Sequence, residues 1–256
     1  MPLPLVRVAE AAAAAESLRG RVVLVTGATG GLGRAVSLAC ASAGATVILA
    51  GRKVRALEEV HDAIAEAGGP APAIYPLNLE GATPDDYDAL AEAVRQQCGG
   101  LDGIVHAAAH FEGLRTIAQT QPIDWLRAEQ VGLNAPFLLT RACLPLLQAC
   151  RDSAVVFVVD DPDRIGRAYW GSYGVAKFAL AGLASILHEE TSGSSLRVHA
   201  LLPAPMRTAL RRMAYFGEDT SMRPSPQSAG DAVAFLLGDG GRGLRGMTLD
   251  LRSERD

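Results

Sequence analysis

From Arg21 onward, short runs of β-branched and aliphatic residues alternate with longer stretches of helical periodicity. This alternation predicts parallel strands whose connecting helices cover both faces of one sheet. The predicted strands are 22–26, 46–50, 73–77, 103–107, 154–159, 196–202 and 247–251. The predicted helices are 31–43, 53–67, 84–97, 123–149, 170–191 and 227–237. We therefore expect an α/β, doubly wound Rossmann-type fold with a seven-stranded, mostly parallel sheet and helices on both faces.

The chain of 256 residues contains no proline- or serine-rich linker and no shift in composition that would divide it. We expect one domain over residues 18–256. Residues 1–17 form an alanine-rich N-terminal extension, in which the run 9–15 predicts a short helix because alanine has the highest helix propensity.

Charge and composition argue against several classes of protein. The chain has 24 basic and 28 acidic residues, a formal charge of −4, and no clustered basic surface that would favour nucleic acid. It has no signal peptide and no apolar run of about 18 residues that would favour a membrane. Its four cysteines are far apart, its histidines do not form a metal-ligand set, and we expect a cytoplasmic protein without a metal.

A glycine-rich turn follows the first predicted strand and precedes a predicted helix. It runs from Thr26 to Gly33 and contains glycine at positions 27, 30, 31 and 33. Glycines let the backbone approach a pyrophosphate, whose charge is favoured by the amide groups at the helix N-terminus. The strand before it, the helix after it and a second strand about 20 residues later predict a dinucleotide site.

The end of the second strand predicts which dinucleotide binds. An acid at this position would favour NAD, but Ala50 and Gly51 are followed by the cations Arg52 and Lys53. Arg34, next to the glycine turn, offers a third positive charge. We expect NADP, with NAD less favoured; the alternative is that these cations are merely solvated charges at the start of a helix.

Further motifs carry a resemblance to a known family. Glycines 27, 31 and 33 have a distinctive spacing, Tyr173 and Lys177 form a Tyr-x-x-x-Lys motif, and Asn134 lies in a predicted helix. Over residues 18–251 the chain resembles the short-chain dehydrogenase/reductase family, and the stretches 166–173 and 246–250 resemble its YciK-like group of bacterial oxidoreductases.

The resemblance implies roles for individual residues. Tyr173 would be the general acid/base, Lys177 would lower the pKa of its phenol and bind the nicotinamide ribose, and Asn134 would hold a relay water. The substrate would be a small alcohol or carbonyl compound, and the protein a homodimer or homotetramer. The residues expected to bind the cofactor are Gly27, Thr29, Gly30, Gly31, Leu32, Gly33, Arg52, Asn78, Ala107, Tyr173, Lys177, Pro203 and Thr208.

The sequence departs from the family pattern on the substrate side. Asp160 occupies the position of the family's catalytic serine, 13 residues before Tyr173. The family's Asn-Ala-Gly reads Ala107-Ala108-Ala109, and its Pro-Gly reads Pro203-Ala204. An ionised Asp160 can only accept a hydrogen bond, whereas a protonated one could donate to a substrate carbonyl.

These departures leave two functions open. The first is an NADP(H)-dependent oxidoreductase in which Asp160 serves as an unusual fourth catalytic residue beside Tyr173, Lys177 and Asn134. The second is a catalytically impaired NADP(H)-binding member that acts as a sensor or scaffold. Residues 203–226 are proline-rich and predict either a substrate lid, with a helical piece at 206–215, or a surface loop without a role.

Overall fold

The structure is a computed structural model that describes residues 2–8 and 11–253. Its strands are β1 (Leu5–Arg7), β2 (Val22–Thr26), β3 (Thr46–Gly51), β4 (Ala73–Pro76), β5 (Gly103–His106), β6 (Ser153–Val158), β7 (Leu196–Leu202) and β8 (Thr248–Asp250). Its α-helices are α1 (Gly31–Ser42), α2 (Val54–Glu66), α3 (Pro84–Cys98), α4 (Pro122–Glu129), α5 (Ala135–Ala149), α6 (Pro162–Ile165), α7 (Gly171–Glu190), α8 (Ala209–Ala214) and α9 (Gln227–Leu237).

The strands form one sheet in the order β1-β8-β7-β6-β5-β2-β3-β4, and every pair of neighbours is parallel. The chain first builds outward from β2 through β3 to β4, and then crosses over to β5 and builds in the other direction. The order therefore reverses between β2 and β5, where ligands bind in doubly wound folds. The predicted fold class is confirmed, with eight strands in the described residues instead of seven.

The eighth strand comes from the N-terminal extension. β1 pairs with β8, and the amide of Thr248 donates to the carbonyl of Pro4 at 2.8 Å. The helix predicted over residues 9–15 is wrong for residues 11–15, which are irregular or form a turn; residues 9 and 10 lie outside the described residues. A short isolated helix is difficult to nucleate even with alanine, whereas the open edge of β8 offers backbone hydrogen bonds.

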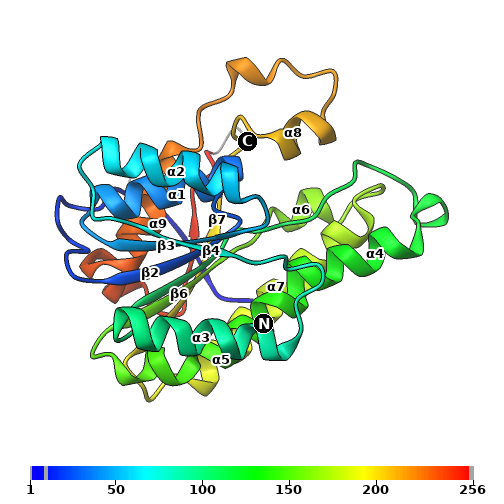
Figure 1. Cartoon of the computed structure of the whole chain (residues 1–256). Helices are drawn as coiled ribbons and strands as arrows, with labels where there is room; N and C mark the ends of the chain where they lie inside the picture. Colours follow the sequence, from blue (N-terminus) through cyan, green and yellow to red (C-terminus); the bar gives the residue numbers. More distant parts are fainter. Residues whose placement is uncertain (1, 9–10, 254–256) are drawn as a thin grey trace.

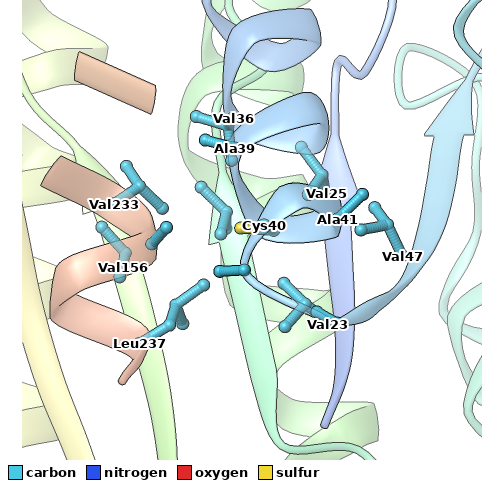
Figure 2. Close-up of a cluster of buried hydrophobic side chains, with 14 of the residues drawn as sticks. Val23, Val25, Val36, Ala39, Cys40, Ala41, Val47, Val156, Val233 and Leu237 are labelled. Carbon is cyan, nitrogen blue, oxygen red and sulfur yellow. The ribbon is translucent and has the colours of Figure 1, made fainter. Parts of the chain in front are cut away.

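Helices cover both faces of the sheet (Figure 1). Helices α1, α2 and α9 lie on one face, and α3, α5 and α7 lie on the other. Figure 2 shows the first layer, where Cys40 of α1 and Val233 of α9 pack with Val25 and Val156 of the sheet. Alternate strand residues, such as Leu24 and Val155, face the second layer. These two cores anchor the strands whose carboxyl ends carry the candidate site.

The predicted continuous helix over residues 123–149 is wrong in its middle. A π-helical segment, Gln130–Asn134, separates α4 from α5, and the amide of Ala135 donates to the carbonyl of Gln130. Pro136 has no amide hydrogen to give to the carbonyl four residues earlier, so the α-helical pattern cannot continue unchanged through this point. The interruption changes which side chains of this segment face the sheet edge.

The segment after β7 extends beyond the layered core and carries α8 (Figure 1). The helical piece predicted over residues 206–215 is shorter in the structure and spans Ala209–Ala214. The Thr208 hydroxyl caps it by accepting a hydrogen bond from the Arg211 amide at 3.2 Å. This segment lies next to the carboxyl ends of the strands, where the candidate site is found.

Candidate active site

A cavity of about 410 Å³ lies at the carboxyl ends of the strands, where the strand order reverses. The glycine turn after β2, the segment after β5, Asp160 after β6 and residues 203–211 after β7 all contribute to its walls. The cavity is lined by each residue expected to bind the cofactor: Gly27, Thr29, Gly30, Gly31, Leu32, Gly33, Arg52, Asn78, Ala107, Tyr173, Lys177, Pro203 and Thr208. The fold thus brings these separated segments together.

Two positions of the turn accept no side chain. Gly27 has φ +65°, and a Cβ there would lie 2.9 Å from Cα of Ala108. A Cβ on Gly33 would lie 2.1 Å from the carbonyl oxygen of Gly27. Helix α1 therefore begins directly against the turn, with its free amide groups at the cavity wall, an arrangement that suits a pyrophosphate.

Cations gather at the end of β3, as the sequence predicted. Arg52 and Lys53 line the cavity, whereas Arg34 is exposed and does not line it. Arg52 forms an ion pair with Glu80, a residue that the sequence analysis did not single out. Glu80 also lies 3.6 Å from Nδ1 of His110. Because Glu80 follows β4 rather than β3, the rule of an acid at the second strand's end does not identify it.

Asp160 makes direct contact with the predicted acid/base residue. The hydroxyl of Tyr173 donates to Oδ2 of Asp160 at 2.6 Å. The other carboxylate oxygen, Oδ1, accepts from the amide of Asp161 at 2.7 Å and forms an ion pair with Arg164. The side chain of Asp160 is 7% exposed. Surrounded by donors and paired with a guanidinium, the carboxylate is arranged to accept hydrogen bonds rather than to donate one.

This arrangement opposes the effect expected for Tyr173. Burial raises the pKa of the Tyr173 phenol well above its ordinary value, and the negative charge of Asp160 adds to the increase. The charge of Arg164 acts in the opposite direction. Burial and Asp160 dominate the pKa of this phenol, and the lowering by Lys177 that the family resemblance implies stays a prediction.

Lys177 lies one helical turn after Tyr173 on α7. Its side chain is buried, and Nζ donates to the carbonyl of Val158 at 2.6 Å. Nζ is 5.9 Å from the centre of the Tyr173 ring. Burial lowers the pKa of Lys177 to about 8, although the charge of Asp160 acts to raise it. Near neutral pH the lysine therefore still carries its charge at the cavity wall.

Asn134 is not brought to the cavity. It is exposed, does not line the cavity, and its amide nitrogen donates to Oε1 of Gln130 at 3.1 Å. The buried position that faces α7 is Gly132, where a Cβ would lie 2.9 Å from Cβ of Ala176. The structure therefore does not support the predicted relay role of Asn134, because the π-helical segment turns it towards solvent.

Arg164 and the aromatic wall of the site were not predicted from the sequence. The Arg164 guanidinium lies 5.1 Å from the centre of the Trp170 ring, which packs against Tyr173 and Phe111. Tyr215, from the segment after α8, completes this group. Asp160 lies before the first residue of α6, Pro162, and Arg164 lies within this helix, so no periodic pattern in the sequence indicated that the two side chains would meet.

The loop after β5 divides its residues between two cavities. His110 lines both the main cavity and a cavity of about 20 Å³ beside it, whereas Glu112 and Arg115 line the smaller cavity and not the main one.

Within residues 2–8 and 11–253, no cluster of three potential metal-ligating side chains occurs. None of the helices in these ranges has the length and apolar character needed to cross a membrane.

Comparison with known proteins places these features in a family. The sequence model for short chain dehydrogenase matches residues 21–217. The chain is 36% identical over 238 residues to the uncharacterized oxidoreductase YciK of Escherichia coli K12, covering 93% of this chain and 94% of that protein.

Solved structures of similar proteins indicate the same family. A short chain dehydrogenase from Pseudomonas syringae has a TM-score of 0.90 and 40% identity, with 94% of this chain and 98% of that chain covered. A short chain dehydrogenase from Shigella flexneri 2a str. 301, complexed with NADP, has a TM-score of 0.89 and 35% identity, with 93% and 99% covered. The chain therefore belongs to the short-chain dehydrogenase/reductase family and is an oxidoreductase similar to YciK.

Proposed function

We propose that this protein is an NADP(H)-dependent oxidoreductase that interconverts an alcohol and a carbonyl compound. The preference for NADP(H) is supported by Arg52 and Lys53 at the end of β3 and by the NADP complex of the Shigella relative. The glycine turn fits a pyrophosphate because its close backbone contacts leave the amide end of α1 open to the cavity. When bound, the nicotinamide accepts or supplies the hydride.

The hydrogen bond between Tyr173 and Asp160 carries the proposed chemistry. During alcohol oxidation, the substrate hydroxyl gives its proton to Oη of Tyr173, while the phenolic proton passes to Oδ2 of Asp160 across the 2.6 Å contact. Hydride leaves the alcohol carbon, and the carbonyl product forms. Arg164 keeps the carboxylate in position, and Lys177 provides positive charge beside the ring of Tyr173.

This role differs from that of a hydroxyl donor. Both carboxylate oxygens of Asp160 are engaged by donors, so the residue is suited to take a proton from Tyr173 rather than to polarise a carbonyl. We therefore infer that alcohol oxidation is the favoured assay direction. Production of NADPH from a panel of alcohols tests this proposal: activity lost in Tyr173→Phe supports it, and oxidation that persists in that variant contradicts it.

A second candidate is a dinucleotide-binding protein that senses or scaffolds without chemistry. Two observations favour it: the Tyr173 hydroxyl is already engaged by Asp160, and Asn134 lies outside the cavity. Calorimetric titration with NADP+ and NADPH, combined with turnover assays of Asp160→Ser, separates the two candidates. Binding without turnover, followed by a large gain of activity in Asp160→Ser, would favour the second candidate.

We also propose that the protein forms a homo-oligomer. Helices α5 and α7 carry large apolar side chains that are about half exposed: Phe137, Val175, Phe178 and Ile186. A second copy would remove this apolar surface from water. Light scattering of the native protein and of Phe178→Glu tests the proposal; a monomeric native protein would exclude it.

A further inference from the structure

Another cavity, of about 200 Å³, adjoins the main one on the substrate side. Its lining contains Arg164, Arg211, Arg223 and Arg252, with Asp161 as the single acidic residue among the described lining residues. Arg164 and Arg211 also line the main cavity, together with Pro203 and Pro205, so the two spaces meet at these residues. We call this cavity of about 200 Å³ the arginine annex.

The charges of Arg211 and Arg223 are only partly compensated. Both guanidinium groups bind Glu218: Arg211 through Nε at 2.6 Å and Nη2 at 2.9 Å, and Arg223 through Nε at 2.7 Å. One carboxylate thus serves two cations. Nη1 of Arg211 and Nη1 of Arg223 have no hydrogen-bond partner among the described residues. A guanidinium can donate five hydrogen bonds, so donors remain for an incoming anion.

The acids around the arginine annex are already engaged. Asp161 accepts from Nη1 of Arg252 at 2.8 Å, and Arg252 is also held by both oxygens of Asp250. Asp160 is held by Arg164 and Tyr173. Nε of Arg164 is buried without a hydrogen-bond partner among the described residues. The acidic groups therefore face their own partners, and the unused donors belong to arginines.

We propose that the arginine annex binds an oxyanion of the substrate, a carboxylate or a phosphate, while the reacting carbon of the same molecule lies at Tyr173. Arg211 and Arg223 are the expected specificity-determining residues. Both belong to the segment after β7, so binding of the anion would also fix this segment over the site. The reacting end of this assignment rests on the proposed function, whereas binding of the anion does not.

Calorimetry with a matched series of probes tests the proposal. In the presence of NADP+, which prevents turnover of a ketone, the protein is titrated with 4-oxopentanoate, its methyl ester and 4-oxopentyl phosphate. We expect the ester to bind at least about 10-fold more weakly than one of the two anions. The anion that binds more tightly shows whether the arginine annex prefers a carboxylate or a phosphate. Equal binding of the ester and both anions, or no saturable binding of either anion, would overturn the proposal.

Variants assign the binding to the arginine annex. Arg211→Met and Arg223→Met should each weaken anion binding by about 10-fold. Arg212→Met is the matched control, because Arg212 lies beside Arg211 on α8, is exposed and lines neither the main cavity nor the arginine annex. The affinity of this variant for the anion should stay within about 2-fold of the native value. Equal effects of all three variants would contradict the assignment.

Glu218→Gln should change the affinity for the anion in the opposite direction. Removing the carboxylate that occupies both arginines should strengthen anion binding several-fold, because the amide keeps the shape but not the charge. If Arg211 and Arg223 serve only to hold the segment after β7 in place, this variant weakens anion binding or leaves it unchanged, and the proposal fails. Variant-sensitive anion binding in a protein that oxidises no alcohol would instead contradict the proposed function alone.

Discussion

The hydroxyl of Tyr173 donates its hydrogen to Asp160 across 2.6 Å, so the predicted acid/base residue of this chain is coupled to a carboxylate rather than to a second hydroxyl. Arg164 balances the carboxylate from its other oxygen. In the proposed oxidation this pair is the path of the proton, which begins at the cavity and ends in a compensated ion pair.

Removing the charge of Asp160 should make Tyr173 easier to ionise. In Asp160→Asn the phenol loses a neighbouring negative charge, so its pKa falls from its raised value while burial still acts on it. Ultraviolet difference titration follows phenolate formation. The double variant Asp160→Asn/Tyr173→Phe is the control and should lack the ionisation step of Tyr173; an unchanged titration in Asp160→Asn would contradict the coupling.

Lys177 should make stability depend on pH between about 8 and 10.5. Its pKa is lowered from 10.5 in the unfolded chain to about 8 by burial, so over this interval the unfolded state binds more protons. Lys177 therefore increases the free energy of unfolding as the pH rises through this interval, by about 3 kcal/mol in total. Urea unfolding of Lys177→Met should lack this contribution; an identical pH dependence in both proteins would show that the pKa is not lowered.

The cations at the end of β3 should control affinity for NADP(H). We expect Arg52→Ala to weaken binding of NADPH by about 10-fold or more and to leave NADH almost unaffected, since only NADPH carries the 2′-phosphate. Glu80→Gln should strengthen NADPH binding because it releases Arg52 from its ion pair. Arg34→Ala is the control, since Arg34 does not line the cavity; equal losses in the two arginine variants would exclude a specific role.

Gly33 should be the least tolerant position of the glycine turn. A methyl group there meets the carbonyl oxygen of Gly27 at 2.1 Å, so Gly33→Ala must displace the start of α1. We expect a loss of about 1–3 kcal/mol in the free energy of unfolding and loss of detectable NADPH binding. Gly182→Ala is the matched control, because a Cβ at Gly182 meets no atom within 4 Å. Similar effects of both variants would show that the close contact is unimportant.

The sequence predicted the repeated strand and helix pattern because the period of apolar residues is a local signal. It also identified segments that line one cavity, since the ends of parallel strands meet at one sheet edge. It missed β1, whose three residues form a strand only because the distant edge of β8 is open. It misplaced Asn134 because Asn134 lies in a π-helical segment just before Pro136. Such a change in the backbone hydrogen bonds leaves no mark in the pattern of apolar residues.

The state of Asp160 was left open by the sequence for a similar reason. The family resemblance implied that Asp160 and Tyr173 would be close, but it did not reveal that Arg164 reaches back to the same carboxylate. The arginine annex was equally hidden, because its cations come from α6, from the segment after β7 and from beyond β8. Contacts between such distant segments are set by packing, not by any local pattern.

The most direct test of the account is the single-turnover rate of NADPH formation from a preformed complex of enzyme, NADP+ and alcohol, compared between the native protein and Asp160→Asn. The variant keeps the shape of the side chain but cannot accept the phenolic proton. We predict that the rate falls by about 100-fold or more while the affinity for NADP+ is unchanged. A rate equal to or above that of the native protein would contradict the role of Asp160 as the proton acceptor.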